Sequence, residues 1–124
     1  MTETTLLLRQ IHPSFIKLGR VTSQAFRPTP KDEQKLSVYD GDLIEPAASW
    51  VHYRNRNLES VGVMAVTVEE CRKEELVVRS SPEHFREHAE IDYLQFNANQ
   101  CEKKGKRLKS VAEARGWMHQ ADRD

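Results

Sequence analysis

The sequence contains few cysteines, no excess of charge of either sign and no long apolar segment. It has two cysteines among 124 residues, and its 19 Lys and Arg residues balance its 19 Asp and Glu residues. So few cysteines argue against a disulfide-stabilised secreted domain, and the zero net charge argues against a dedicated nucleic-acid-binding or membrane-surface protein. No segment approaches the roughly 18 apolar residues of a transmembrane helix, and Leu6–Leu8 is too short for a signal peptide. We therefore expect a cytoplasmic protein with Cys71 and Cys101 as reduced thiols.

The sequence also lacks the short motifs that identify common enzymes and DNA-binding proteins. It contains no Gly-rich phosphate loop and no nucleophile elbow. The string His84-Phe85-Arg86-Glu87-His88 matches the H-x-x-E-H pattern of inverted zinc peptidases. Those enzymes take a third ligand from a later helix, for which the 36 residues after His88 are too few. We interpret both histidines as ordinary loop and strand residues, and we expect no metal ion and no cofactor.

The patterning of the chain predicts one domain, residues 1–124, of the α+β class. No segment repeats with a period of 20 to 50 residues, and Pro and Gly, five of each, occur singly between periodic stretches. Apolar runs and alternation predict five or six short strands, in segments 5–11, 21–26, 36–39, 60–66, 76–79 and 88–94, with 117–119 as a further candidate. Helical spacing and caps predict three or four helices, in segments 13–18, 46–56, from residue 67 onward and 98–115. We expect the strands to form a mixed sheet with the helices packed on it.

Three of these segments carry faces of different character. Ala47, Trp50, Val51 and Arg54 share one arc of the second helix, which we expect to be its buried side. In segment 88–94 apolar residues alternate with His88, Glu90 and Asp92, so one face of that strand is solvated or specialised. The arc of the last helix predicted to be buried consists of Cys101, Gly105, Leu108, Val111 and Ala112.

Charge is distributed unevenly along the second half of the chain. Residues 69–92 hold eight acidic and four basic residues, whereas residues 103–115 hold six basic residues and one acidic residue. A solvated helix face beside an acidic neighbour accounts for this pattern. The alternative is a patch that binds phosphate or an acidic partner.

Basic side chains are concentrated near the N-terminal third of the chain. In the segment from Gly19 to Asp42, Arg20, Arg27 and Lys31 alternate with hydroxyls such as Ser23 on a loop that two prolines make rigid, which suits an anion or nucleotide site. Arg9 lies within an apolar strand, where its guanidinium needs a carboxylate, a cluster of carbonyls or a ligand anion. An internal salt bridge to Asp40, Asp42 or Glu90 is the alternative for Arg9. The candidate ligand-binding residues are Arg9, Arg20, Ser23, Arg27 and Lys31.

Two histidines are candidates for carrying protons near neutral pH, namely His12 and His88. His12 directly precedes Pro13, so its alternative role is to cap the first short helix. The alternative for His88 is simple exposure to solvent.

Three strings carry a resemblance: RVTSQAFRPTPKD from Arg20, LSVYDGD from Leu36 and EHAEIDY from Glu87. They resemble a set of small uncharacterised bacterial proteins of similar length, over about residues 6–117. A fainter resemblance is to ADP-ribosyltransferase-like folds, which have an Arg or His on the first strand, a Ser on a second and a Glu on a late strand. Arg9, Ser37 and Glu90 occur in that order, and the resemblance implies an enzyme that handles a nucleotide.

Two functions from different classes follow. The first is a non-catalytic accessory protein that acts through a protein partner, where the protein and its partner are encoded in one bacterial toxin, defence or secretion locus. The second is a small enzyme or binder of a nucleotide or phosphate-bearing ligand that uses Arg9 and residues 19–42. Nucleic acid and membrane are not expected as partners under either hypothesis.

Overall fold

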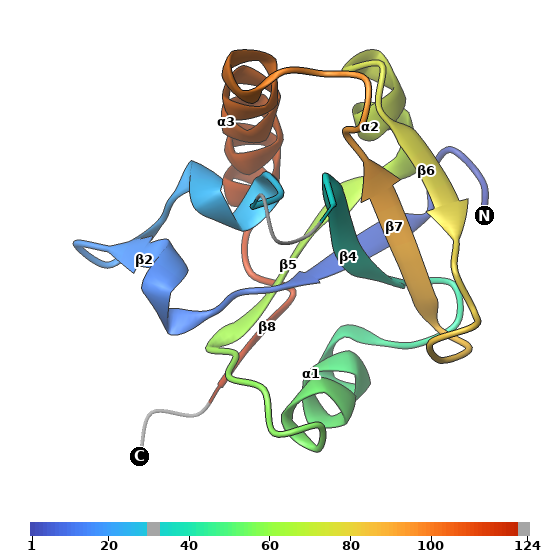
Figure 1. Ribbon diagram of the computed structural model, residues 1–124. Coiled ribbons are helices and arrows are strands. Elements are labelled where there is room, and N and C mark those ends of the chain that lie inside the picture. The colour runs from blue at the N-terminus through green and yellow to red at the C-terminus, as the bar shows by residue number, and fades with distance from the viewer. Residues whose placement is uncertain (30–32, 122–124) are drawn as a thin grey trace.

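The computed structural model describes residues 1–29 and 33–121, and it confirms the α+β class. Eight strands, three α-helices and two short 3-10 helices follow one another along this part of the chain (Figure 1). In chain order they are β1 (Leu6–Gln10), η1 (Pro13–Phe15), β2 (Ile16–Lys17), β3 (Arg20–Val21), η2 (Ser23–Phe26), β4 (Lys35–Asp40), α1 (Pro46–Arg54), β5 (Gly62–Thr67), α2 (Val68–Lys73), β6 (Val77–Ser80), β7 (His88–Asp92), α3 (Ala98–Arg115) and β8 (His119–Gln120).

Six of the strands form one sheet in the order β6-β7-β4-β1-β5-β8, and β2 and β3 form a separate hairpin. All the ladders between described strands are antiparallel, whereas the sequence analysis expected a mixed sheet. Antiparallel neighbours need no crossover helix, so the three α-helices are free to pack on the faces of the sheet. Strand β1 lies in the interior of the sheet, where both Leu7 and Leu8 are fully buried on opposite faces.

One face of the sheet carries the larger hydrophobic core. Residues from β1, β4, β5 and β7 meet residues of η2, α2 and α3 there, with Tyr93, Phe26 and Ile91 among the large side chains that are fully buried. Figure 1 shows α2 and α3 on the same side of the sheet. Helix α3 approaches η2 closely at Gly105, where a Cβ atom would lie 3.0 Å from Cβ of Arg27. The absence of a side chain at Gly105 therefore permits this packing.

The other face is covered over only half of its width. Helix α1 contacts β1, β5 and β8, and a small cluster built on Leu8, Tyr39, Val63 and Ala65 lies beneath it. In Figure 1, α1 lies alone on this side of the sheet. Tyr39 of β4 contacts His52 of α1, so the described helices leave β6, β7 and the Lys35–Ser37 part of β4 on this face without a helical cover.

The buried side of α1 differs from the predicted arc. Ala47, Val51 and Arg54 are exposed, and Trp50 is partly buried. Ser49 is the fully buried residue of α1, and its hydroxyl accepts a hydrogen bond of 3.0 Å from the Gln10 amide. Polar pairing with β1 orients this helix, so the positions of its apolar residues were a poor guide.

Two short segments also differ from the prediction. Segment 13–18 is a 3-10 turn followed by β2 rather than a single helix, and segment 21–26 is extended only at its start before it becomes η2. Both elements are so short that contacts with α3 and with each other decide their conformation. Of the proline-containing loop, residues 27–29 carry no regular element, and Pro30 to Asp32 lie outside the described residues.

The caps and the charge pattern of the second half agree with the sequence analysis. Thr67 and Glu70 form the predicted capping box of α2. Nη1 and Nη2 of Arg115 on α3 donate to the Glu70 carboxylate at 3.0 and 2.9 Å. Arg107 of the same helix donates to Glu74 at 2.7 Å. The acidic segment and the basic helix are therefore neighbours. No helix in residues 1–29 or 33–121 has the length and apolarity needed to cross a membrane.

Candidate functional site

A polar pocket of about 590 Å³ lies on the open half of the sheet face, beside α1. Strands β4, β7 and β6, the 81–87 loop and the end of α1 supply its walls. Because side chains alternate along a strand, Lys35 and Ser37 face the same side as Tyr39. Ser37 lies directly opposite Glu90, and Glu90 lies directly opposite Arg79. The register of three strands thus collects polar side chains in one row.

His88 lies at the bottom of this pocket, with 6% of its surface exposed. Its Nδ1 is 3.1 Å from the carbonyl oxygen of Ser81 and its Nε2 is 3.2 Å from the hydroxyl of Ser37. A carbonyl only accepts hydrogen bonds, so the ring proton is assigned to Nδ1 and the lone pair to Nε2. Burial lowers the pKa of His88 below 6.5. The neutral ring therefore holds its lone pair toward Ser37 and the pocket.

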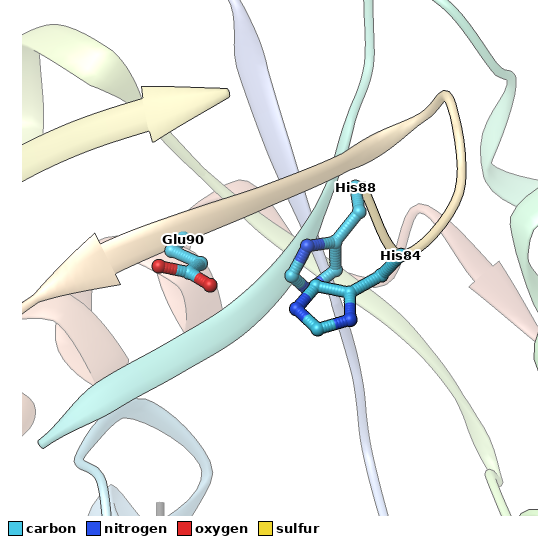
Figure 2. Close-up of side chains that lie close together, drawn as sticks. All are labelled: His84, His88 and Glu90. Atoms are coloured by element: carbon cyan, nitrogen blue, oxygen red, sulfur yellow. The ribbon is translucent and has the colours of Figure 1, made fainter. Parts of the chain in front are cut away.

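Two further side chains converge on His88. The imidazole of His84 packs edge to face against that of His88, with the ring centroids 4.8 Å apart. The nitrogen and oxygen atoms that His84, His88 and Glu90 offer as ligands all lie within 4.8 Å of one another. Figure 2 shows the imidazole of His84 overlapping that of His88 in the view, with the Glu90 carboxylate to one side of both rings. Two imidazoles and one carboxylate are a donor set that binds transition-metal ions.

The buried hydroxyl of Ser81 supports this cluster from behind. It lies 3.2 Å from Oε1 of Glu90 and 2.7 Å from Oε1 of Glu83. The hydrogen bond from Ser81 lowers the pKa of Glu83 below 4.5. One residue thus orients His88 through its carbonyl and contacts the Glu90 carboxylate through its hydroxyl.

Three cationic side chains line the sheet-edge and α1 sides of the pocket. Arg79 is neutralised by Asp92, whose carboxylate lies 2.7 Å from Nη1. Arg56 lies over the Phe85 ring, 5.0 Å from its centroid. Within the described parts of the chain, neither Arg56 nor Lys35 has a carboxylate within 4 Å. The pocket therefore contains two cations that no ion pair within residues 1–29 and 33–121 balances.

Arg9 reaches the same pocket in a structural role. Its Nε donates to the carbonyl of Ala25 at 2.7 Å and its Nη1 donates to the carbonyl of Ser37 at 3.0 Å. The guanidinium also lies over the Phe15 ring. Of the partners considered for Arg9, the structure thus provides a pair of carbonyls, which tie η2 and β4 to β1.

The other predicted ligand-binding residues do not meet in one place. Arg20 and Ser23 line a separate hollow at the β2-β3 hairpin, where Arg20 forms a two-pronged ion pair with Glu113. Arg27 lines a third hollow and lies 3.8 Å from Glu102. Lys31 lies outside the described residues. The segment from Gly19 to Asp42 therefore contributes to several surfaces, and among its described residues Glu33 and members of β4 line the pocket.

The two histidines predicted to carry protons have different surroundings. His12 accepts a hydrogen bond from the backbone of Ser14 at 3.0 Å and so caps η1, as its alternative role required. His88 is in the pocket and is largely shielded from solvent. Sequence reasoning did not identify Lys35, Arg56, His84 or Glu90 as a site with His88. The alternation of segment 88–94 placed Glu90 on the face of His88, but nothing local indicated that Ser37 would lie opposite it.

Comparisons of the chain with protein-family models, curated proteins and solved structures returned no match. The resemblances stated above stay predictions. Arg9, Ser37 and Glu90, which carried the fainter one, do line the same pocket. The site is therefore interpreted from its own geometry.

Proposed function

We propose that the polar pocket binds a small ligand that carries a phosphate or carboxylate group. The observation that carries this proposal is the presence of Lys35 and Arg56 in the pocket, where neither has a carboxylate partner among residues 1–29 and 33–121. Cations that no internal carboxylate balances, in a concave site, are suited to capturing an anion from solvent. This proposal keeps the second function considered from the sequence. It narrows the site, which was assigned to Arg9 and residues 19–42, to the sheet face on which Lys35 and Ser37 of β4 lie.

The remaining polar groups of the pocket support an anionic ligand. The exposed hydroxyl of Ser37 lies between Lys35 and Tyr39 on β4 and can donate to a phosphate oxygen once it turns from His88. Arg56 presents a planar guanidinium that suits a two-pronged contact with phosphate or carboxylate. The acids that line the pocket are Glu33, Glu83 and Glu90, of which Glu83 accepts a hydrogen bond from the Ser81 hydroxyl. The wall nearest β4 and α1 thus supplies donors.

A ligand screen by thermal unfolding tests this function. Inorganic phosphate, ATP, NAD, citrate and a short RNA would each be added to the full chain. A ligand at a hundredfold excess over its dissociation constant stabilises the folded state by about 2.7 kcal/mol, so a binding compound should raise the melting temperature of the wild type. The double variant Lys35→Gln with Arg56→Gln should lose that shift.

Lys17→Gln is the matched control, because Lys17 is an exposed cation of β2 that lines a different hollow. Its shift should equal that of the wild type. An equal shift in the Lys35/Arg56 double variant would overturn the proposal. If none of the compounds stabilised the wild type, the proposal would also fail, and the accessory protein that acts through a protein partner would be the hypothesis to pursue.

A further inference from the structure

We propose that His84, His88 and Glu90 bind one divalent transition-metal ion, such as Zn²⁺, at the bottom of the pocket. In the described parts of the chain these residues form the one group of three His, Cys, Asp or Glu side chains whose ligand atoms converge. The inference goes beyond the binding of an anion, because it depends on none of the cationic residues. It also departs from the sequence analysis, which expected no metal ion.

The first support is the orientation of His88. Histidines that bind metals almost always donate their second ring N–H to a carboxylate, a backbone carbonyl or water, which fixes the tautomer and leaves the other nitrogen to the ion. His88 makes this contact with the carbonyl of Ser81 through Nδ1. Its Nε2 is therefore the nitrogen that would bind the metal, and the structure already holds the ring in the required tautomer.

The second support is the outer contact of the carboxylate. The Ser81 hydroxyl lies within hydrogen-bond distance of Oε1 of Glu90, at 3.2 Å. The one proton of this hydroxyl serves the shorter contact with Glu83, at 2.7 Å. When it turns to Glu90 it makes a hydrogen bond of the kind that orients ligating carboxylates. Ser81 is itself 3% exposed, so a buried residue behind the cluster contacts two of the three ligands.

The spacing of the ligand atoms fits an ion after small side-chain rotations. Bonds of about 2.1 Å in a tetrahedral site place neighbouring ligand atoms roughly 3.4 Å apart, compared with the 4.8 Å within which the present atoms lie. His84 is on the exposed side of the cluster, and Glu90 is only partly buried, so both can move inward. The Ser37 hydroxyl must release Nε2, which a rotation about χ1 accomplishes.

The chemistry of the donors selects the class of ion. Two imidazoles and one carboxylate favour Zn²⁺, Fe²⁺, Co²⁺ or Ni²⁺ over Mg²⁺ and Ca²⁺, which prefer oxygen ligands. Three protein ligands leave at least one coordination position open, as in catalytic rather than structural zinc sites. That position would face the pocket, where water or the anionic ligand of the proposed function can reach it.

The site differs from that of the inverted zinc peptidases, whose sequence string the chain matches. There both histidines lie on one helix, whereas here His84 is in a loop and His88 begins β7. The third ligand is Glu90 from the same strand, and Glu87 is not a member of the cluster. A metal at Nε2 also occupies the lone pair that a proton would use, so His88 as metal ligand and His88 as proton carrier are mutually exclusive.

Metal titration of the full chain tests the inference. The protein, stripped with a chelator, would be titrated with Zn²⁺ by calorimetry, and Co²⁺ would be added as a spectroscopic probe of the coordinating atoms. One equivalent of Zn²⁺ should bind, Mg²⁺ should not, and Co²⁺ should show the absorption bands of nitrogen and oxygen ligation. His84→Ala and Glu90→Gln should each weaken Zn²⁺ binding by more than the 10–100-fold that loss of an outer contact costs. Circular dichroism should show that both variants fold.

Two controls make the outcome specific. His12→Ala removes a histidine that caps η1 far along the chain, and Glu87→Gln removes the acid that the H-x-x-E-H string would use; neither should change the affinity for Zn²⁺. The absence of stoichiometric Zn²⁺ binding would overturn the inference. So would equal weakening by His12→Ala, or Zn²⁺ binding that survives His84→Ala and Glu90→Gln unchanged. Lys35→Gln with Arg56→Gln should retain Zn²⁺, which separates failure of the metal site from failure of the anion site.

Discussion

Two alternative roles were considered for Arg9, a contact with a ligand and a structural contact within the protein. Arg9 is therefore the most informative residue to replace. Its guanidinium donates to the carbonyls of Ala25 and Ser37 and so links β1 to η2 and to β4. Arg9→Met keeps most of the aliphatic stem and removes both donors. We expect this variant to fold less stably, because two backbone carbonyls lose a charged partner.

The size of the effect follows from the two hydrogen bonds. A hydrogen bond to a charged group contributes about 1.5–3 kcal/mol. Since Arg9 is only partly buried, water replaces part of the loss, and we expect a decrease of about 2–4 kcal/mol in the free energy of unfolding. Urea unfolding followed by circular dichroism measures this quantity directly. The slope of the transition should stay that of the wild type, because the fold itself is retained.

Arg20→Met is the matched comparison for this experiment. Arg20 also carries a two-pronged contact, but its partner is the Glu113 carboxylate at the surface, and exposed ion pairs contribute little. Its unfolding curve should nearly coincide with that of the wild type. If Arg9→Met unfolded like the wild type and instead abolished the response to an anionic ligand, the structural assignment would be wrong and Arg9 would be a ligand contact.

Two further predictions concern groups far from the pocket. Cys71 and Cys101 are free and buried, and burial raises the pKa of both thiols, that of Cys71 to about 12. A thiol reagent should therefore label neither cysteine in the folded protein and both in urea. Stoichiometric labelling of the native state would contradict this prediction. Burial alone would raise the pKa of Glu70, but hydrogen bonds from Arg115 and Thr67 bring it below 4.5. A carboxyl whose pKa is lowered by folding stabilises the protein above its unfolded pKa and loses that contribution as the pH falls through the folded pKa. Arg115→Ala should therefore be less stable than the wild type at pH 7, and this difference should narrow in urea unfolding below about pH 4.5; a difference independent of pH would show that Arg115 acts through packing alone.

The sequence predicted correctly those strands and helices in which one buried face determines the spacing of the apolar residues. The alternation of segment 88–94 predicted β7 and its buried side, and the 98–115 arc predicted α3 together with most of its core residues. The capping box at Thr67 was visible as a spacing of three residues. In each of these cases local pattern and tertiary packing agree, which is the condition under which a sequence is informative.

The prediction failed where a distant contact decides the local conformation. Segment 21–26 reads as extended, but its end forms η2, and Gly105 of α3 allows the backbone of Phe26 to approach the helix. The face of α1 was assigned from apolar positions, whereas the hydrogen bond from Gln10 to Ser49 fixes its orientation. Neither partner is recognisable from the segment that it controls.

The pocket shows the same limit for function. His88 and Glu90 were placed on one face of a strand, and Ser37 on another strand, by their spacing alone. Only the register of β4 against β7 brings Ser37 opposite Glu90. His84 and His88 of the H-x-x-E-H string were interpreted as ordinary loop and strand residues, whereas in the structure their rings are in contact. No helix carries them, and the acid beside them is Glu90 rather than Glu87 of the string.

The position of α1 explains why part of this sheet face is polar. Helix α1 packs on β1, β5 and β8, and it reaches β4 through Tyr39, whose hydroxyl lies 2.8 Å from Nδ1 of His52. The face of β4, β7 and β6 must then be compatible with water, which apolar residues at those positions would not allow. Lys35, Ser37 and Glu90 meet this requirement, and the burial of His88 beneath the 81–87 loop goes beyond it. Contact with water explains the exposed polar residues of this face without any function. It does not explain why the imidazole of His88 is buried and held in one orientation, so His88 is the residue that indicates a functional site.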